Sequence, residues 1–288
     1  MESIGVFYFS GTGNTEIIAN MITEQFREKQ LDVDLIKIED ILKNKKDVSI
    51  EKYDLIGIGS QVIGYSTPKL VMKFIKILPK QKDKKVFLFR TAGGVAPINF
   101  NVSKSSIRRL KSKGYDVYYE RLFSLCSNWV KKFDDEIVHG LYQACQRKIG
   151  LMCQELIDGD RKFYKTGLGL RIKMGLISRF SSIFISMIGR DLYVDSSCTK
   201  CGHCIHNCPA QNIDDSRNKI KFKMSCNSCL RCVYSCPKHA IKFKLLKFIP
   251  VTGGYNINET LAKLNNEQKS DHGFVPRFYE NYLTDDNL

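Results

Sequence analysis

Several kinds of segment are missing from the sequence. No apolar run reaches the roughly 18 uncharged residues that a membrane-spanning helix needs, so we expect no transmembrane span. The N-terminus has neither the basic region nor the apolar core of a secretion signal, so we expect a cytoplasmic location. No Gly-Lys-Ser or Gly-Lys-Thr closes a glycine-rich loop, which argues against a site for a nucleoside triphosphate.

Acidic residues are scarce beside basic ones. Lys and Arg together number 45 against 30 Asp and Glu, which gives a formal net charge of +15. A basic chain suits an anionic partner, and nucleic acid is the obvious candidate. The lysine-rich tracts, however, fall on expected loops and helix faces and lack interleaved aromatic residues. We therefore expect solvated surface at these tracts and no nucleic-acid binding.

Cysteine is concentrated in one region. Eight of the 11 cysteines form two runs of the pattern Cys-x2-Cys-x2-Cys-x3-Cys-Pro, and the second run begins 28 residues after the first. Structural zinc usually takes two Cys-x2-Cys pairs about 15–20 residues apart, so each run has cysteines that zinc would not use. A disulfide framework needs an oxidising compartment, which nothing in the sequence signals. The spacing is that of ligands to cubane iron–sulfur clusters.

Over roughly residues 192–245, the chain resembles bacterial ferredoxins with two [4Fe–4S] clusters. In that family, the cysteine before each proline ligates the other cluster. The resemblance implies two ligand sets: Cys198, Cys201, Cys204 and Cys236 for cluster I, and Cys226, Cys229, Cys232 and Cys208 for cluster II.

The charge of this region departs from the ferredoxin pattern. Ferredoxins of the family are usually acidic, whereas residues 198–244 carry nine Lys and Arg against two Asp and Glu. A basic shell favours the more negative, reduced clusters and should raise their potentials. It also predicts protein redox partners with acidic docking surfaces.

Before the cysteines, apolar strands alternate with helical patterns. We expect buried strands at 4–9, 31–38, 53–59, 86–90 and 116–123, and helices at 17–28, 68–78, 103–113 and 135–157. Strands that alternate with helices predict a parallel α/β sheet covered on both faces. Five strands fit the doubly wound order 2-1-3-4-5, whose ligands bind at the carboxyl ends of the strands.

The turn after the first strand is a candidate phosphate site. Its hydroxyls and amide, its glycines and the helix N-terminus that follows all direct donors at an anion. The run Phe7–Thr15 resembles the FMN-phosphate loop of flavodoxins, and this resemblance covers about residues 1–157. It implies FMN, with the phosphate held by Ser10, Gly11, Thr12, Gly13, Asn14 and Thr15. The alternative is a glycine-rich turn without a ligand.

The flavodoxin resemblance places the flavin ring between two later loops, 60–67 and 91–94. Candidate ring contacts are Gln61, Gly64, Tyr65, Thr91, Ala92, Gly93 and Gly94. Tyr65 is either a stacking partner of the ring or part of the loop packing. Neither loop carries Asp or Glu, so two-electron reduction should be easier than in typical flavodoxins. The second loop also lacks the usual aromatic residue, which could leave one flavin face open to a substrate.

The loop after the fifth strand contains the single tryptophan of the chain, Trp129. At the carboxyl end of a strand, Trp129 could contact flavin, cap the fold or dock the ferredoxin-like region. The remaining cysteines, Cys126, Cys145 and Cys153, have no ligand spacing, and we predict that they are buried thiols.

Four segments follow from these patterns: a flavodoxin-like FMN domain at 1–157, a helical inter-domain segment at 158–190, a small α+β ferredoxin domain at 191–246 and a C-terminal extension at 247–288. In 158–190, apolar residues recur at helical spacing, while Arg171, Lys173 and Arg179 argue against a membrane span. One interpretation is a helix packed between the domains. The other is a helix that contacts a membrane surface or a partner through 168–189.

Together, the two resemblances imply a flavodoxin–ferredoxin fusion of a type found in anaerobic bacteria. We expect electron transfer between FMN and two [4Fe–4S] clusters, in a carrier that serves protein partners. The alternative is a terminal FMN-dependent reductase of a small acceptor (a quinone, a nitro compound or an unsaturated acid) fed by the clusters. A redox sensor is a third hypothesis, although no nucleic-acid module supports it. The sequence assigns no catalytic residue and does not decide whether the protein is an enzyme.

Overall fold

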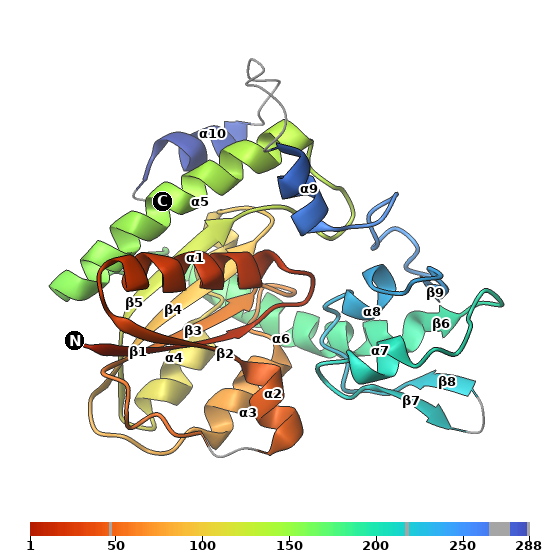
Figure 1. Cartoon of the computed structure of the whole chain (residues 1–288), viewed down its shortest axis with the longest axis horizontal. Coiled ribbons are helices and arrows are strands. Elements are labelled where there is room, and N and C mark those ends of the chain that lie inside the picture. The colour runs from red at the N-terminus through yellow and green to blue at the C-terminus, as the bar shows by residue number, and fades with distance from the viewer. Residues whose placement is uncertain (46–47, 217–218, 265–276, 287–288) are drawn as a thin grey trace.

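A parallel five-stranded sheet forms the centre of the N-terminal part of the computed structural model, which describes residues 1–45, 48–216, 219–264 and 277–286 (Figure 1). Its strands are β1 (Ser3–Phe9), β2 (Asp32–Lys37), β3 (Leu55–Gln61), β4 (Lys84–Ala92) and β5 (Tyr115–Ser124). The sheet order is β2-β1-β3-β4-β5, and every neighbouring pair is parallel. The predicted doubly wound order is confirmed.

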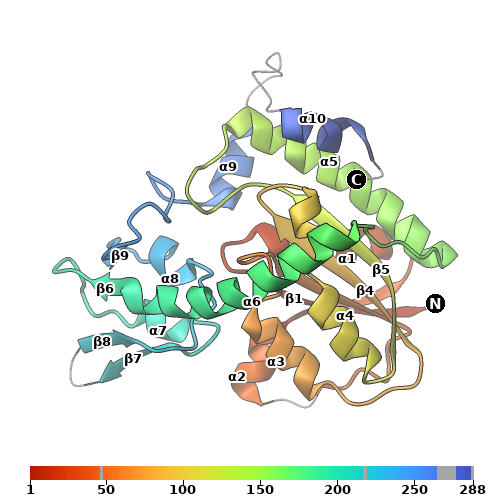
Figure 2. The same cartoon turned by 180° about the vertical axis from the view of Figure 1, so that it is seen from behind.

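Helices cover both faces of this sheet. On one face lie α1 (Asn14–Glu28) and α5 (Asp135–Asp158), and on the other lie α2 (Ile38–Asn44), α3 (Lys69–Ile77) and α4 (Lys104–Lys111) (Figures 1 and 2). The sequence patterns predicted all of these except α2. That helix follows β2 directly, at Ile38, so no Gly, Pro or other breaker marks its start.

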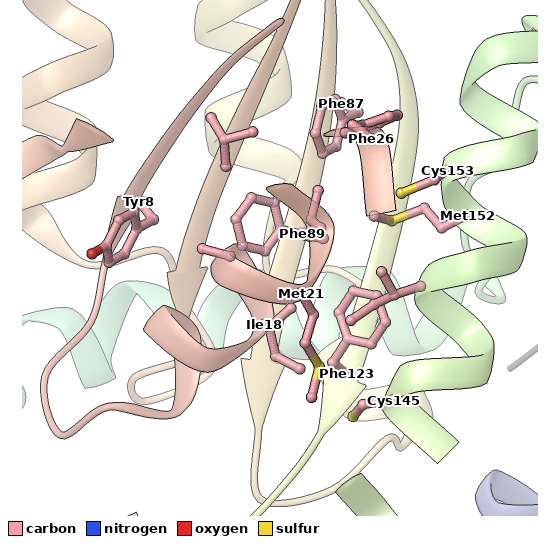
Figure 3. Close-up of a cluster of buried hydrophobic side chains, with 14 of the residues drawn as sticks. Tyr8, Ile18, Met21, Phe26, Phe87, Phe89, Phe123, Cys145, Met152 and Cys153 are labelled. Carbon is pink, nitrogen blue, oxygen red and sulfur yellow. The ribbon is translucent and has the colours of Figure 1, made fainter. Parts of the chain in front are cut away.

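The core between α1, α5 and the sheet fixes the position of the turn before α1. Ile18, Phe26, Phe89, Phe123 and Met152 have no exposed surface there (Figure 3). Burial of each such side chain contributes roughly 1.5–3 kcal/mol. A second cluster packs α3 and α4 against the opposite face. The sheet ends are therefore held rigidly from both sides.

The strand β5 is an edge of the sheet, and segments from outside 1–157 cover it. The amides of Glu120, Leu122 and Ser124 donate to the Lys162 carbonyl, the Tyr164 hydroxyl and the Tyr282 hydroxyl at 2.9, 2.9 and 3.1 Å. An open edge strand invites pairing with other chains, and these contacts prevent it. The inter-domain segment and the C-terminal extension thus complete the first domain.

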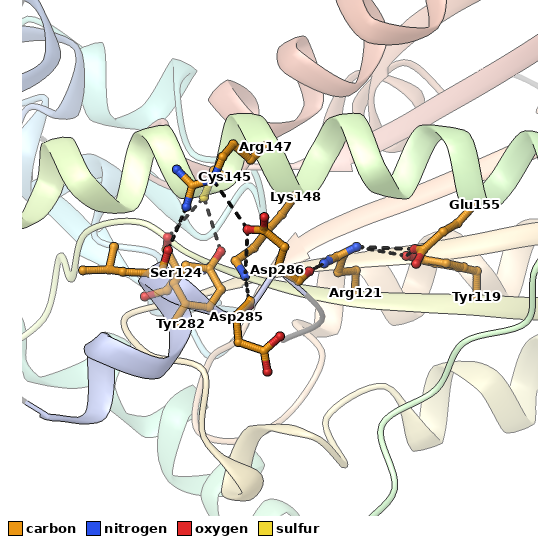
Figure 4. Close-up of polar contacts among 11 residues, drawn as sticks. Tyr119, Arg121, Ser124, Cys145, Arg147, Lys148, Glu155, Tyr282, Asp285 and Asp286 are labelled. Carbon is orange, nitrogen blue, oxygen red and sulfur yellow. Dashed lines mark hydrogen bonds and ion pairs between the residues drawn. The ribbon is translucent and has the colours of Figure 1, made fainter.

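The C-terminal extension packs beside β5 and α5 (Figure 4). It contains α9 (Ile257–Leu264) and α10 (Arg277–Thr284), and residues 265–276 and 287–288 lie outside the described residues. Tyr282 is buried beside Cys145, and Arg121 donates to the Asp286 carbonyl (Figure 4). Cys126, Cys145 and Cys153 are all buried, as predicted. Burial raises the pKa of Cys145 and Cys153 to about 12, so both stay protonated.

The cysteine-rich region forms a small unit at the carboxyl ends of the strands (Figure 1). Strand β6 (Leu192–Val194) pairs with β9 (Ile241–Phe243), and β7 (Ile213–Ser216) pairs with β8 (Lys219–Phe222), both antiparallel. Two one-turn helices, α7 (His203–His206) and α8 (Arg231–Tyr234), each contain the third cysteine of a run.

The helix α6 (Leu168–Asp191) runs from the first domain to the cysteine-rich unit (Figure 2). Its last turns pack between the two, because Ile185 and Ile188 are buried together with Ile63 and Leu230. Among the described residues, α6 is the helix long and apolar enough to cross a membrane by length and composition, with mean hydropathy 1.3 and 31% of the window buried. Such a helix is weak evidence of a span, so the expected absence of a transmembrane span stays a prediction.

Candidate cofactor sites

A cavity of about 340 Å³ lies at the carboxyl ends of β1, β3 and β4. Eleven of the 13 residues predicted to bind FMN line it: Ser10, Gly11, Thr12, Asn14, Thr15, Gln61, Gly64, Tyr65, Thr91, Ala92 and Gly93. Gly13 and Gly94 are not in its wall. The structure therefore brings the turn after β1 and both predicted ring loops to one hollow, which we call the FMN cavity.

The turn after β1 is arranged to receive an anion. The Ser10 hydroxyl accepts the Gly13 amide at 3.1 Å, and α1 begins at the next residue, Asn14. The first amides of a helix have no acceptor within the helix and carry its positive partial charge. The Thr15 and Thr91 hydroxyls lie 2.7 Å apart below them. These donors suit the phosphate of FMN.

Gln61 offers an unpaired polar group to a ligand. Both polar atoms of its side chain are buried, and neither has a hydrogen-bond partner within the described part of the chain. Leaving such a group unpaired costs about 1–3 kcal/mol. Because Gln61 lines the FMN cavity, the heteroatoms of a flavin ring would remove that cost. The cavity thus fits the group that the sequence predicts.

Tyr65 stands on the rim of the FMN cavity. Its side chain is 39% exposed and its φ is +58°, a left-handed conformation that a tyrosine adopts at a cost of about 1–3 kcal/mol. Strain of this kind usually persists where function needs it. The exposure of the ring favours the stacking interpretation over loop packing.

The loop after β5 forms one wall of the FMN cavity, and of its residues the sequence indicated only Trp129 as a flavin contact. Cys126, Ser127, Asn128 and Trp129 line the FMN cavity. Trp129 also packs against the cysteine-rich unit, and the neighbouring Val130 amide donates to the Ile249 carbonyl of the C-terminal extension at 2.8 Å. Two of the three interpretations of Trp129, flavin contact and docking of the cysteine-rich unit, are therefore compatible with its position.

Each predicted cysteine set surrounds its own hollow. Cys208, Cys226, Cys229 and Cys232 line one hollow, and Cys198, Cys201, Cys204 and Cys236 line another. Among the described residues, no three His, Cys, Asp or Glu side chains meet closely enough to hold a single metal ion. Each hollow is lined by four cysteines, one for each iron of a cube. This arrangement fits a cubane cluster at each hollow.

Backbone amides point at four of the cysteine sulfurs. The Lys200 and Ser228 amides donate to Cys198 and Cys226 at 3.4 and 3.2 Å, and the Asn212 and Ala240 amides donate to Cys208 and Cys236 at 3.3 Å. Hydrogen bonds to ligand sulfurs raise the reduction potential of a cluster. The bonds occur at matching positions of the two runs, so they would act alike on a cluster held by either run.

The thiols of the second cysteine set lose their protons at neutral pH only when a cation binds them. Burial raises the pKa of the Cys226 and Cys229 thiols, that of Cys229 to about 12. At neutral pH such a thiol keeps its proton unless a metal replaces it. Iron would therefore be what holds these side chains as thiolates.

Arg231 joins the second cysteine loop to the turn after β1. Its guanidinium forms a bidentate pair with the buried Glu39, at 2.6 and 2.8 Å, and donates to the carbonyls of Ser10, Gly11 and Asn207 at 2.5, 3.1 and 3.1 Å. A planar fork of five donors suits this site, since every N–H has an acceptor. The position of the predicted phosphate turn is thus set partly by the cysteine-rich unit.

The two units touch at Gly11 and Cys229. A Cβ atom on Gly11 would lie 2.7 Å from the Cys229 carbonyl oxygen and 2.8 Å from the Cys229 Cβ, so only glycine fits. Ser228 and Cys229 accordingly form part of the wall of the FMN cavity. No sequence signal links positions more than 200 residues apart, and the fold alone brings them together.

Comparison with known proteins matches both regions. Residues 5–106 match the family model of the flavodoxin domain, and residues 190–244 match that of the 4Fe-4S dicluster domain. An uncharacterised protein of Methanocaldococcus jannaschii is 36% identical over 108 residues, 37% of this chain and 64% of that protein. A flavodoxin of Megasphaera elsdenii is 36% identical over 93 residues, 31% of this chain and 65% of that protein. A flavodoxin of Haemophilus influenzae is 49% identical over 59 residues, 20% of this chain and 30% of that protein. The chain spans less than two thirds of the length of each of these relatives.

Proposed function

Because this chain joins an N-terminal flavodoxin domain to a C-terminal 4Fe–4S dicluster domain, we propose that it carries electrons between FMN and two [4Fe–4S] clusters for protein redox partners. Bound FMN exchanges electrons singly or in pairs, and each cluster exchanges one. The observation that carries the proposal is the presence of Ser228 and Cys229 in the wall of the FMN cavity.

In this proposal, the chain's own residues bind the groups and hold them together. The turn at 10–15 holds the phosphate, Gln61 and Tyr65 contact the ring, and the two cysteine sets hold the clusters. The ion pair between Arg231 of the second cysteine loop and Glu39 holds that loop against the phosphate turn. Fusion replaces a diffusional encounter with a permanent contact, which raises the effective concentration of one centre at the other.

The two cysteine sets take different positions in the proposed carrier. The second set adjoins the FMN cavity through Cys229, whereas Cys201 of the first set is exposed to solvent. We therefore assign cluster II as the inner centre, next to the flavin, and cluster I as the outer centre, where partners exchange electrons.

The surface around the outer centre supports a partner with an acidic docking surface. Exposed cations surround the first cysteine set: Arg190, Lys200, Lys219, Lys221, Lys238 and Lys244. A cationic surface attracts an anionic partner as the two approach, and salt screens this attraction. The partner of the proposed carrier therefore presents carboxylates, and its association rate should fall as ionic strength rises.

The alternative function, a terminal reductase of a small acceptor, has less support from the FMN cavity. None of the described residues that line it carries a charged side chain, so the wall offers no carboxylic acid, imidazole or ammonium as a general acid. The Tyr65 hydroxyl on the rim is the donor that such a reaction would use. Turnover of quinones, nitro compounds or unsaturated acids without a protein partner would favour this function.

An anoxic reductive titration tests the proposal. The reconstituted protein should contain about eight irons and one FMN, which is the stoichiometry of two cubes and one flavin. After reduction by a substoichiometric electron donor, flavin absorbance and cluster EPR should relax together at a rate independent of protein concentration. A chain that binds eight irons but no flavin would contradict the FMN assignment. A rate that rises with protein concentration would contradict an internal transfer.

A further inference from the structure

One side of α6 is an apolar surface turned to solvent. Six large apolar side chains lie along it, each between 50 and 70% exposed: Leu168, Ile172, Leu176, Phe180, Phe184 and Met187. Their spacing of three or four residues keeps them on one side of the helix over its whole length. We call this set the α6 stripe. Contiguous exposed patches of this kind mark interaction sites.

The α6 stripe continues beyond the end of the helix. Asp191, its last residue, accepts the amides of Leu245 and Leu246 at 3.0 and 2.8 Å, so the loop after β9 lies against the end of α6. In that loop, Leu245 is 84% exposed and Phe248 is 63% exposed. Exposed apolar side chains therefore lie on both sides of this junction, on α6 and on the loop after β9.

Basic residues predominate along the stripe. Residues 161–190 contain seven Lys and Arg and no Asp or Glu. Arg171, Lys173, Arg179 and Arg190 are exposed on α6 itself. Long cationic side chains beside an apolar stripe are typical of helices that lie in the headgroup region of anionic membranes, where their stems stay apolar and their charged ends reach phosphate.

The opposite side of α6 is held by the protein. The Ser181 hydroxyl donates to the Gly64 carbonyl, and the Ser228 hydroxyl donates to the Ile185 carbonyl at 2.7 Å. A Cβ atom on Gly189 would overlap the Cys226 Cβ, so the helix backbone touches the second cysteine loop. To span a bilayer, α6 would have to leave both cofactor sites. A helix that lies on the surface keeps all of these contacts.

We propose that the protein docks on an anionic lipid surface through the α6 stripe, with Leu245 and Phe248 as its continuation. Pairing of the stripe with a second copy would bring two cationic segments together, which their repulsion opposes. Because the Ser181 hydroxyl donates to the Gly64 carbonyl from the side of α6 opposite the stripe, docking would place the helix between the lipid and the rim of the FMN cavity.

Vesicle sedimentation of the anoxic holoprotein tests the docking. The wild type should sediment with vesicles of phosphatidylcholine containing phosphatidylserine and stay in solution with phosphatidylcholine alone. The double variant Leu176→Glu/Phe180→Glu should lower the bound fraction about tenfold or more, since two buried apolar contacts are replaced by charges that anionic lipid repels. The triple variant Arg171→Gln/Lys173→Gln/Arg179→Gln should weaken binding about fivefold for each charge removed.

A matched control separates docking from general damage. Leu151 is an exposed apolar residue of α5, which lies on the opposite face of the sheet from α6 (Figures 1 and 2), and Leu151→Glu should bind vesicles as the wild type does. Iron and flavin contents should stay the same in all variants. Equal binding of the wild type and the double variant would overturn the proposal, as would no binding to anionic vesicles. Resistance to a high-salt and carbonate wash, which indicates a spanning helix, or a lipid-free dimer lost in the double variant would also overturn it.

Discussion

The two cysteine runs share one backbone conformation. Residues with positive φ occur at matching positions 28 residues apart: Lys200 and Ser228, Gly202 and Leu230, Gln211 and His239. The amide-to-sulfur hydrogen bonds match in the same way. The repeated spacing of the cysteines thus dictates the same local loop twice.

The surroundings of the two runs differ. Cys201 and His203 of the first run are exposed, whereas Leu230 of the second is 4% exposed and Arg231 reaches the buried Glu39. Cysteine spacing therefore decides where a cluster is held, and the residues between the cysteines decide what lies next to it. Exchange of residues at matching positions is the direct test of this comparison.

The largest effect is expected at Arg231 and its counterpart in the first run, His203. Arg231→Met keeps much of the apolar stem but leaves Glu39 buried without its partner. Removing one partner of a buried ion pair costs about 3–5 kcal/mol, and we expect about 3 because the Arg231 side chain is 21% exposed. Anoxic thermal unfolding should show the loss, and electron exchange between flavin and clusters should slow.

His203→Ala is the control for this prediction, because it removes a side chain at the same position of an exposed loop. Its unfolding temperature and exchange rate should stay near those of the wild type. If both variants behaved alike, the inner and outer assignment of the two runs would be wrong.

A smaller effect is expected from Gly11→Ala, which pushes the phosphate turn away from Cys229. The added Cβ cannot be accommodated at 2.7 Å from the Cys229 carbonyl oxygen, and overpacking of this kind costs about 1–3 kcal/mol. Gly93→Ala alters the same FMN cavity on the side of Ser127, where a Cβ would lie 3.2 Å from the Ser127 Cβ. Both variants should weaken flavin binding, but only Gly11→Ala should slow flavin-to-cluster exchange. Stopped-flow reduction measures this, and equal rates in the two variants would contradict the contact.

The sequence predicted the parts of each site that are local in the chain. Four of the five sheet-covering helices follow from apolar periodicity, which acts over a few residues. The sheet order follows from the alternation of strands and helices, and the two cysteine sets follow from the resemblance to two-cluster ferredoxins. Eleven of the 13 predicted FMN contacts line one cavity for the same reason, because parallel strands bring their carboxyl ends to one edge.

Contacts between distant segments could not be predicted in this way. Gly11 and Cys229, or Arg231 and Glu39, carry no pattern that names the partner, since neither belongs to a shared helix or strand. The sequence likewise gives no signal that Lys162, Tyr164 and Tyr282 cover β5. Such contacts depend on the shape of the folded domains.

A third pair of variants alters Gly202 and Leu230, which share a left-handed conformation with φ of 73° and 59°. A left-handed leucine costs about 1–2 kcal/mol, but truncation of a buried leucine costs about 2–5 kcal/mol. Because the packing term is larger, Leu230→Gly should destabilise the protein by about 2 kcal/mol despite the relief of strain. Gly202→Ala should cost about 1 kcal/mol, since its Cβ would meet only the His206 ring at 3.4 Å. Stabilisation by Leu230→Gly in thermal unfolding would show that strain, and not packing, dominates at the inner loop.

The smallest effect concerns Tyr234 and its counterpart His206. The Tyr234 hydroxyl donates to the Asn128 carbonyl at 2.6 Å and accepts the Val251 amide at 2.8 Å, so it ties the FMN cavity wall to the dicluster domain. Tyr234→Phe removes both bonds without altering the ring and should cost about 1 kcal/mol. His206→Ala, at the exposed matching position, should cost less. Because Asn128 also donates to the Thr12 hydroxyl at 2.7 Å, Tyr234→Phe should weaken flavin binding slightly, whereas His206→Ala should not. A flavin titration that gave one dissociation constant for both variants would mean that this bond does not couple the second cysteine loop to the FMN cavity.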